Sequence, residues 1–247
     1  MKARDAASLI VLDRRHTEPR FLMGRRAAKH AFMPNVYVFP GGRVDYGDRF
    51  APFVRDYHPD TLDLLLQQMS GRPTALRARM LALAAIRETW EEVGLRLAVK
   101  NPAPRRHAQT SWREFSMTGL APDLAEMHYV ARAITPPGNS RRFDTRFFIF
   151  DASRHLEHQN AASSPELEDV RWVSLDEATA LAIHPITARV LDIVRRTLHH
   201  PSFGKNALPV PFFRADPGDQ GRLVKRVTVL HPGREPEDGG LVTLKKA

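Results

Sequence analysis

The sequence predicts a mixed α/β or α+β fold in which helices cover both faces of a mixed β-sheet. Short apolar runs of strand type alternate along the chain with segments whose apolar residues recur at helical spacing. The 247 residues are 43% hydrophobic, which suffices for one substantial core or two small ones. Strands interleaved with helices in this way favour a sheet sandwiched between helices.

The first segments predict a β-hairpin followed by a third strand. Apolar runs at 8–13 and 20–26 are separated by polar turn residues. The third strand leads into Gly41 and Gly42, which we interpret as a tight turn because glycine interrupts regular structure. The polar region of about 49–74 carries leucines at helical spacing and predicts a small inserted helix.

The longest predicted helix covers about 74–93, and Gly94 stands where a helix ends. The later part of the chain predicts strands at 127–135, 145–152 and 170–175, then helices at about 176–182 and 186–199. After residue 200, prolines and glycines become frequent. We therefore expect residues 201–247 to form a loosely packed extension or an edge hairpin, used for homodimer contacts.

Composition excludes several kinds of site. The chain has no cysteine, so any metal must be held by oxygen or imidazole ligands. The formal net charge of +9 favours anionic ligands such as nucleotides. No apolar run is long enough for a signal sequence or a membrane span, and the chain ends in LKKA rather than in a peroxisomal address. We therefore expect a cytoplasmic protein that binds no membrane.

The segment RETWEEVGL places three carboxylates on one face of the long helix. Glu88, Glu91 and Glu92 are spaced i, i+3 and i+4, and like charges at these spacings repel one another. Oxygen-preferring Mg²⁺ neutralises such a cluster and bridges it to substrate phosphates. We predict a metal site with these three ligands and the Gly41 carbonyl, and we expect Arg87 to pair along the helix or brace the preceding loop.

These residues resemble the Nudix box. Gly42 begins the box, Asp48 occupies the first acidic position, and the second half matches Arg87, Glu88, Glu91, Glu92, Gly94 and Leu95. Together with the flanking strands, the resemblance covers roughly residues 6–199, so we expect a Nudix domain at 1–200. Residues 49–86 stand where the family has a much shorter spacer. Asp48 replaces the usual glutamate, and both an auxiliary site role and a turn-forming role are open for it.

The insertion, FMPNVYVFPGGRVD and RRFDTRFF resemble the branch with coenzyme A diphosphatase-like proteins. The resemblance implies an α/β/α sandwich and hydrolysis, dependent on Mg²⁺ or Mn²⁺, of a nucleoside diphosphate linked to another group. Coenzyme A or an acyl-CoA is the first substrate expected from it. The resemblance also implies catalytic roles for Glu91 and Arg87, and an acid near residue 166 that reaches the site as general base. We favour Glu166 over Glu168.

Four further residues are candidates for substrate binding. Two arginines near a strand end could grip a phosphate, and an Asp/Arg pair on a later strand could contact substrate or only pair internally. They are Arg25, Arg26, Asp144 and Arg146.

A competing hypothesis is a Nudix-fold nucleotide sensor or RNA-binding protein without hydrolytic activity. The basic charge keeps this hypothesis open, whereas the three intact glutamates oppose it. Nucleic acid is accordingly the less favoured partner, and a small-molecule nucleoside diphosphate the favoured one.

Overall fold

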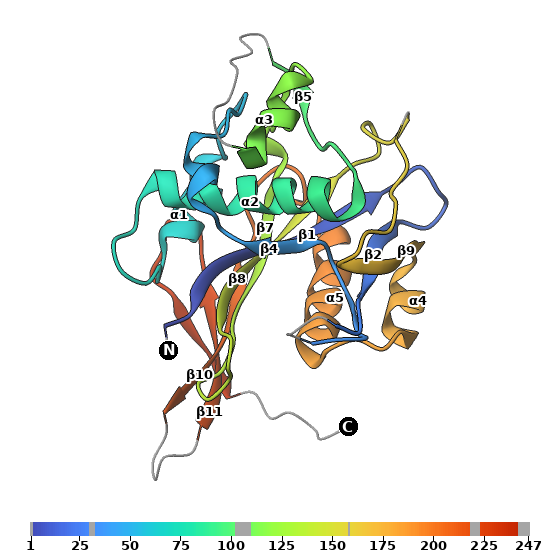
Figure 1. The fold of residues 1–247 in the computed structure, drawn as a ribbon. Coiled ribbons are helices and arrows are strands. Elements are labelled where there is room, and N and C mark those ends of the chain that lie inside the picture. The colour runs from blue at the N-terminus through green and yellow to red at the C-terminus, as the bar shows by residue number, and fades with distance from the viewer. Residues whose placement is uncertain (1, 30–32, 102–109, 158, 218–222, 242–247) are drawn as a thin grey trace.

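A mixed ten-stranded sheet runs through the described part of the molecule, with helices on both of its faces (Figure 1). The computed structural model describes residues 2–29, 33–101, 110–157, 159–217 and 223–241. The strands of the sheet are β1 (Arg4–Asp13), β2 (Arg20–Arg26), β3 (Tyr37–Val38), β4 (Gly41–Arg43), β7 (His128–Ile134), β8 (Phe143–Asp151), β9 (Leu167–Val173), β10 (Val210–Pro217), β11 (Leu223–Leu230) and β12 (Glu237–Leu241).

The main path of the sheet has the order β12-β11-β10-β7-β8-β1-β2-β3, while β4 pairs with β1 and β9 pairs with β2. The pairs β1 with β8 and β7 with β10 are parallel, and the other pairs are antiparallel. The predicted opening hairpin is confirmed by the antiparallel β1–β2 pair. The predicted mixed α/β fold class is likewise confirmed.

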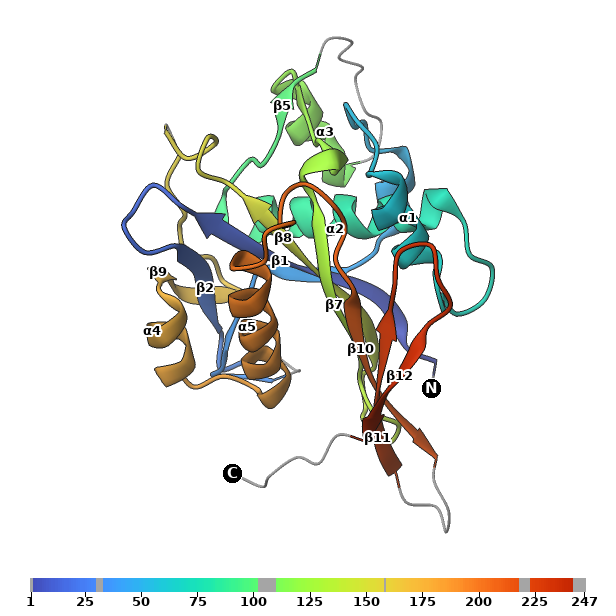
Figure 2. The ribbon, with the colours of Figure 1, turned by 180° about the vertical axis from the view of Figure 1, so that it is seen from behind.

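Helices α2 (Ala75–Val93) and α5 (Pro185–Leu198) pack on opposite faces of this sheet (Figures 1 and 2). The other helices of the described ranges are the 3₁₀ helices η1 (Tyr46–Phe50) and η2 (Leu124–Glu126) and the α-helices α1 (Pro59–Leu66), α3 (Thr110–Met117) and α4 (Leu175–Ala180). Strands β5 (Val99–Lys100) and β6 (Leu120–Ala121) form a separate two-stranded sheet. No helix in the described ranges has the length and apolar character that crossing a membrane requires.

The central strand β1 shows why the sheet is buried on both sides. Its side chains alternate between faces, so Leu9 and Val11 join the core under α2, whereas Ile10 and Leu12 join the core under α5. All four are fully buried. Continuous burial of this kind explains why the strand reads as an uninterrupted apolar run rather than an alternating one.

Helix α2 begins and ends as the sequence predicts. The Thr74 hydroxyl accepts a hydrogen bond from the Arg77 backbone N–H (3.2 Å), and Gly94 ends the helix in a left-handed conformation with φ of 76°. Helix α2 packs against β1 and β4. This packing brings its glutamate-bearing end to the glycines of β4.

The interpretation of Gly41 and Gly42 as a tight turn is wrong. They begin strand β4, which pairs antiparallel with β1 in the register Ser8 with Gly41 and Ala7 with Gly42. A β-carbon on Gly41 would lie 2.4 Å from the Ala7 carbonyl oxygen, and the residue has φ of 150°. The glycine is therefore needed for close approach of two strands.

The described residues after 200 form strands β10, β11 and β12 at the edge of the main sheet beyond β7, which corresponds to the expected edge hairpin rather than to a loosely packed extension. Val210, Phe212 and Leu230 are buried in the core under α2. The predicted insertion of about 49–74 contains the end of η1 and all of α1.

Candidate active site

The three glutamates of the quoted segment lie on the last two turns of α2, beside β4 and β9. Glu92 is buried, and the side chains of Glu88 and Glu91 are 15% and 41% exposed. The cluster therefore opens to solvent on the Glu91 side. This placement matches the single helix face that the sequence spacing predicts.

Arg87 holds two of these carboxylates. Its Nη1 donates to Glu88 Oε1 (2.9 Å) and to Glu91 Oε2 (2.9 Å), and its Nη2 donates to the Arg43 carbonyl oxygen (3.0 Å). Arg87 thus pairs along its own helix, and its second contact is with strand β4 rather than with the preceding loop. The guanidinium therefore offsets part of the repulsion that the glutamates create.

Asp48 holds Arg87 from the other side. The fully buried Asp48 carboxylate accepts from Arg87 Nε (2.8 Å) and Nη2 (3.3 Å), from Trp112 Nε1 (2.9 Å) and from the Asp45 backbone N–H (2.8 Å). Its contacts support a positioning role, with Arg87 as the link to the glutamates. Sequence reasoning missed Trp112, because nothing near residue 112 indicates a contact with Asp48, which lies 64 residues earlier in the chain.

The two glycines of β4 shape the inner wall of the site. The Gly41 backbone N–H donates to Glu92 Oε2 (2.9 Å). A β-carbon on Gly42 would lie within 2.6 Å of both carboxylate oxygens of Glu88. The contact recorded for Gly41 is thus made by its N–H, while the predicted role of its carbonyl as a metal ligand stays a prediction.

The charged forms of the three carboxyl groups are disfavoured by their burial. Burial raises the pKa of Glu88 to about 7, against the lowering effect of Arg87. Burial also raises the pKa of Glu92 to about 8, despite the hydrogen bond from Gly41. The pKa of Glu91 is raised as well, again chiefly by burial. A bound cation would counteract this effect, because it favours the charged form of each carboxylate.

The donor set suits a hard divalent cation. All side chains of the cluster offer carboxylate oxygens, which Mg²⁺ and Mn²⁺ prefer. Within the residues that the structure describes, no three such groups already meet at metal-binding spacing. Their oxygens bond instead to Arg87 and to the Gly41 amide.

Arg26 and Glu166 lie near the buried end of the cluster. Burial lowers the pKa of Arg26, while the charges of Glu92, Glu166 and Glu88 act in the opposite direction. Glu166 is exposed, and its backbone carbonyl accepts from the Ala27 N–H at the end of β2 (3.2 Å). The structure thus brings both predicted residues within electrostatic range of the glutamates.

Arg25 points to a different partner from Arg26. Its Nη2 donates to Glu168 Oε2 (3.1 Å), in a half-exposed ion pair between β2 and β9. Glu168, the alternative acid, is therefore engaged by Arg25. Glu166 stays the better placed of the two acids for the cluster.

Asp144 and Arg146 do not belong to this site. Both are buried on β8, where Asp144 bonds Arg132 and Arg146. Arg146 also bonds Asp5 (2.9 Å), and Asp5 bonds Arg77 at the first turn of α2 (2.6 Å). The predicted substrate role is corrected to the internal pairing that the sequence left open, because burial places the pair beyond a ligand's reach.

Comparison with known proteins agrees with this geometry. Residues 81–192 match the NUDIX domain family. The chain therefore contains a segment that matches the Nudix domain. The matched range includes the glutamate cluster, Glu166, and all of α4.

Two curated relatives carry the same name. The chain is 26% identical over 209 residues to human acyl-coenzyme A diphosphatase NUDT19, covering 65% of this chain and 54% of the relative. It is 25% identical over 234 residues to the protein of that name from Gallus gallus, covering 71% and 62%. The chain thus spans just over half of the human relative and somewhat more of the chicken one.

A solved structure supports the fold. The crystal structure of a NUDIX hydrolase from Alicyclobacillus acidocaldarius is similar with a TM-score of 0.59 and 27% identity, covering 78% of this chain and 90% of that one. The resemblance to Nudix hydrolases is therefore confirmed by the family match and by the fold.

Proposed function

We propose that this Nudix domain is a metal-dependent pyrophosphohydrolase that cleaves the diphosphate linkage of a nucleoside diphosphate derivative. The supporting observation is the gathering of Glu88, Glu91 and Glu92 against the glycine strand β4, with Arg87 held between them and Asp48. A solvated helix surface would not need a buried aspartate and a buried arginine behind its carboxylates.

The glutamates Glu88, Glu91 and Glu92 would hold Mg²⁺ or Mn²⁺, with the Gly41 carbonyl as a further ligand. When bound, the ion shields the charge of the diphosphate and lowers the pKa of a coordinated water. Arg87 keeps two of the carboxylates in place through its two hydrogen bonds from one nitrogen.

Glu166 is the proposed general base, and Arg26 a proposed phosphate contact. An exposed glutamate near Glu92 can accept the proton of a water that attacks one phosphorus. The P–O bond to the bridging oxygen then breaks, and the second phosphate leaves with that oxygen. Arg25 is a second candidate for a phosphate contact, which would require it to leave Glu168.

Coenzyme A or an acyl-CoA is the proposed substrate. The named relatives support this choice, since both are called acyl-coenzyme A diphosphatase. From the sequence we also carry forward a cytoplasmic location and a homodimer formed through 201–247. Light scattering of the purified chain tests the dimer.

The test of the function is product release from coenzyme A, octanoyl-CoA, ADP-ribose, NADH and a diadenosine polyphosphate, with and without Mg²⁺ or Mn²⁺. Glu91→Gln should abolish metal-dependent cleavage, whereas Glu235→Gln, which changes an exposed glutamate between β11 and β12, should not. Absence of turnover for every compound by the folded wild type would contradict the proposal. Binding without turnover would then favour the nucleotide sensor.

A further inference from the structure

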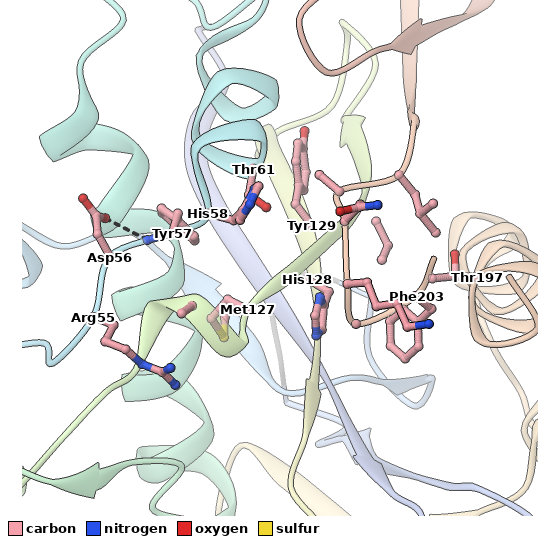
Figure 3. A pocket seen from close by; sticks show the side chains of 17 residues that line it. Arg55, Asp56, Tyr57, His58, Thr61, Met127, His128, Tyr129, Thr197 and Phe203 are labelled. Atoms are coloured by element: carbon pink, nitrogen blue, oxygen red, sulfur yellow. Dashed lines mark hydrogen bonds between the residues drawn. The ribbon is translucent and has the colours of Figure 1, made fainter. Parts of the chain in front are cut away.

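A cavity of about 370 Å³ is lined by residues that include Tyr57, Tyr129 and Phe203 (Figure 3) and by none of the three glutamates. Its residues come from three parts of the chain: the inserted segment before α2, η2 with the first half of β7, and the end of α5 with the linker to β10. The inserted segment and the linker both lie outside the residues that match the NUDIX family. Two segments from outside the matched range thus meet at one cavity.

The cavity is remote from the proposed metal site. The Tyr57 hydroxyl, which belongs to a lining residue, donates to the Ala78 carbonyl oxygen near the start of α2 (3.1 Å). Glu88 follows ten residues later on the same helix. At 1.5 Å per residue, the two positions are separated by roughly 15 Å along the helix axis. A ligand in the cavity would therefore leave the glutamates free.

Much of the lining is aromatic or apolar. Tyr57, Met127 and Tyr129 are buried. Phe203 packs against the His128 ring with 5.0 Å between ring centroids. The volume of the cavity lies at the lower end of the range for small-molecule pockets, which is roughly 300–1,000 Å³. Such pockets are lined largely by apolar and aromatic side chains. This part of the cavity suits the apolar or aromatic body of a small molecule.

Among the described residues that line the cavity, one cation has no ion-pair partner. Arg55 pairs with Asp123 and Glu126, and the lining residue Asp56 pairs with Arg79. The exposed Lys205 forms no ion pair and no side-chain hydrogen bond with the described part of the chain. His128 likewise has no hydrogen bond there through its ring, and burial lowers its pKa, so that it is neutral at pH 7 and can donate or accept.

We propose that this cavity binds a small amphipathic anion, with its apolar or aromatic body between Tyr57, Tyr129 and Phe203 and its carboxylate or sulfonate at Lys205. The buried aromatic and apolar part of the lining accommodates the body, and the ammonium of Lys205, which has no ion-pair partner among the described residues, attracts the anion. Burial of the apolar body supplies most of the binding free energy, because this free energy grows with the apolar area removed from water. The ammonium adds a charge-assisted hydrogen bond.

The test is calorimetric titration of the intact, metal-free chain with octanoate, with uncharged octan-1-ol and with 8-anilinonaphthalene-1-sulfonate. Saturable one-to-one binding of octanoate, displaced by the sulfonate, is the expected result. Lys205→Glu should weaken the binding of octanoate at least about tenfold and change the affinity for octanol by no more than about twofold. Lys100→Glu, an exposed lysine on β5, is the matched control and should change neither.

A second variant addresses the apolar part. Phe203→Ala should weaken the binding of octanoate and of octanol to the same degree, since both ligands have the same apolar body. Absence of saturable octanoate binding, or an equal loss of affinity in Lys205→Glu and Lys100→Glu, would overturn the proposal. Because no metal and no nucleotide are present, the result is independent of whether the glutamate cluster hydrolyses a diphosphate.

Discussion

A β-carbon on Gly42 would lie 2.4 Å from the carboxyl carbon of Glu88, a separation that folded proteins do not tolerate. The carboxylate of Glu88 therefore rests directly on the backbone of β4. Glycine at this position leaves the space that the Glu88 carboxylate occupies in this conformation, and a larger residue would make Glu88 move.

Gly42→Ala should accordingly disturb the site more than the fold. Glu88 can turn away from the added methyl group, which displaces one proposed metal ligand and one Arg87 partner. We expect a loss of about 10- to 100-fold in kcat/KM, as for other changes that misorient metal ligands. Steady-state kinetics measure this loss, and urea denaturation provides the control for folding. Unchanged kcat/KM would show that Glu88 need not lie against β4.

Asp48→Ala should destabilise the protein strongly. The substitution leaves the Arg87 guanidinium buried with one charged partner fewer, and breaking a buried ion pair in this way costs about 3–5 kcal/mol. Urea denaturation measures the free energy of unfolding. A loss below about 1 kcal/mol would contradict the positioning role of Asp48.

Trp112→Phe tests the partner that sequence reasoning missed. It keeps an aromatic ring but removes the Nε1 hydrogen bond to the Asp48 carboxylate, worth about 1.5–3 kcal/mol for a charged acceptor. We expect a smaller loss of stability than for Asp48→Ala, together with a fall in kcat at similar KM. If the two variants lose equal stability, packing rather than the hydrogen bond explains the effect.

A divalent cation should stabilise the folded chain. A ligand that binds only the folded state, at a concentration 100 times its Kd, raises the free energy of unfolding by about 2.7 kcal/mol. Thermal unfolding with and without Mn²⁺ measures the shift in Tm, which we expect for the wild type and for Glu235→Gln. The double variant of Glu88→Gln and Glu92→Gln should show no shift. An equal shift in all three proteins would place the ion elsewhere.

The pH dependence of stability should show the contribution of the Asp5 carboxylate and its ion pairs. Burial raises the pKa of this carboxyl, but hydrogen bonds and charges from Arg77 and Arg146 outweigh burial and bring the pKa below its ordinary value. A lowered carboxyl pKa contributes stability above the unfolded pKa of about 3.9, and that stability is lost as pH falls through the folded value.

Asp5→Asn should therefore destabilise the protein clearly at pH 6 and progressively less below about pH 4. Urea denaturation at pH 6, 4 and 3 checks this. Asp192→Asn, at an exposed position on α5, should match the wild type at each pH. A stability difference for Asp5→Asn that does not change with pH would show that charge is not responsible.

Much of the architecture could be predicted because its signals are local. The run around β1, the helical spacing of α2 and the end of α2 at Gly94 all depend on neighbouring residues. The glutamate cluster could be predicted for the same reason, since residues 88, 91 and 92 share a face of any helix. The Nudix resemblance rests on these same residues.

The predictions that were wrong depend on contacts between distant parts of the chain rather than on local signals. Gly41 and Gly42 are ordinary turn residues by sequence, and only the approach of β1 shows them to be strand residues. Asp144 and Arg146 could face a substrate or each other, and the burial of β8 decided between the two.

The sequence by itself determined the α/β class, the long helix and the three carboxylates on its face, because periodicity and capping act within a few residues. Only the tertiary structure decided that Asp48 and Trp112 support Arg87, that the strands after residue 200 extend the sheet, and that a cavity lies apart from the glutamate cluster. Contacts between residues distant in the chain depend on how sheets and helices pack, and local sequence patterns do not specify that packing.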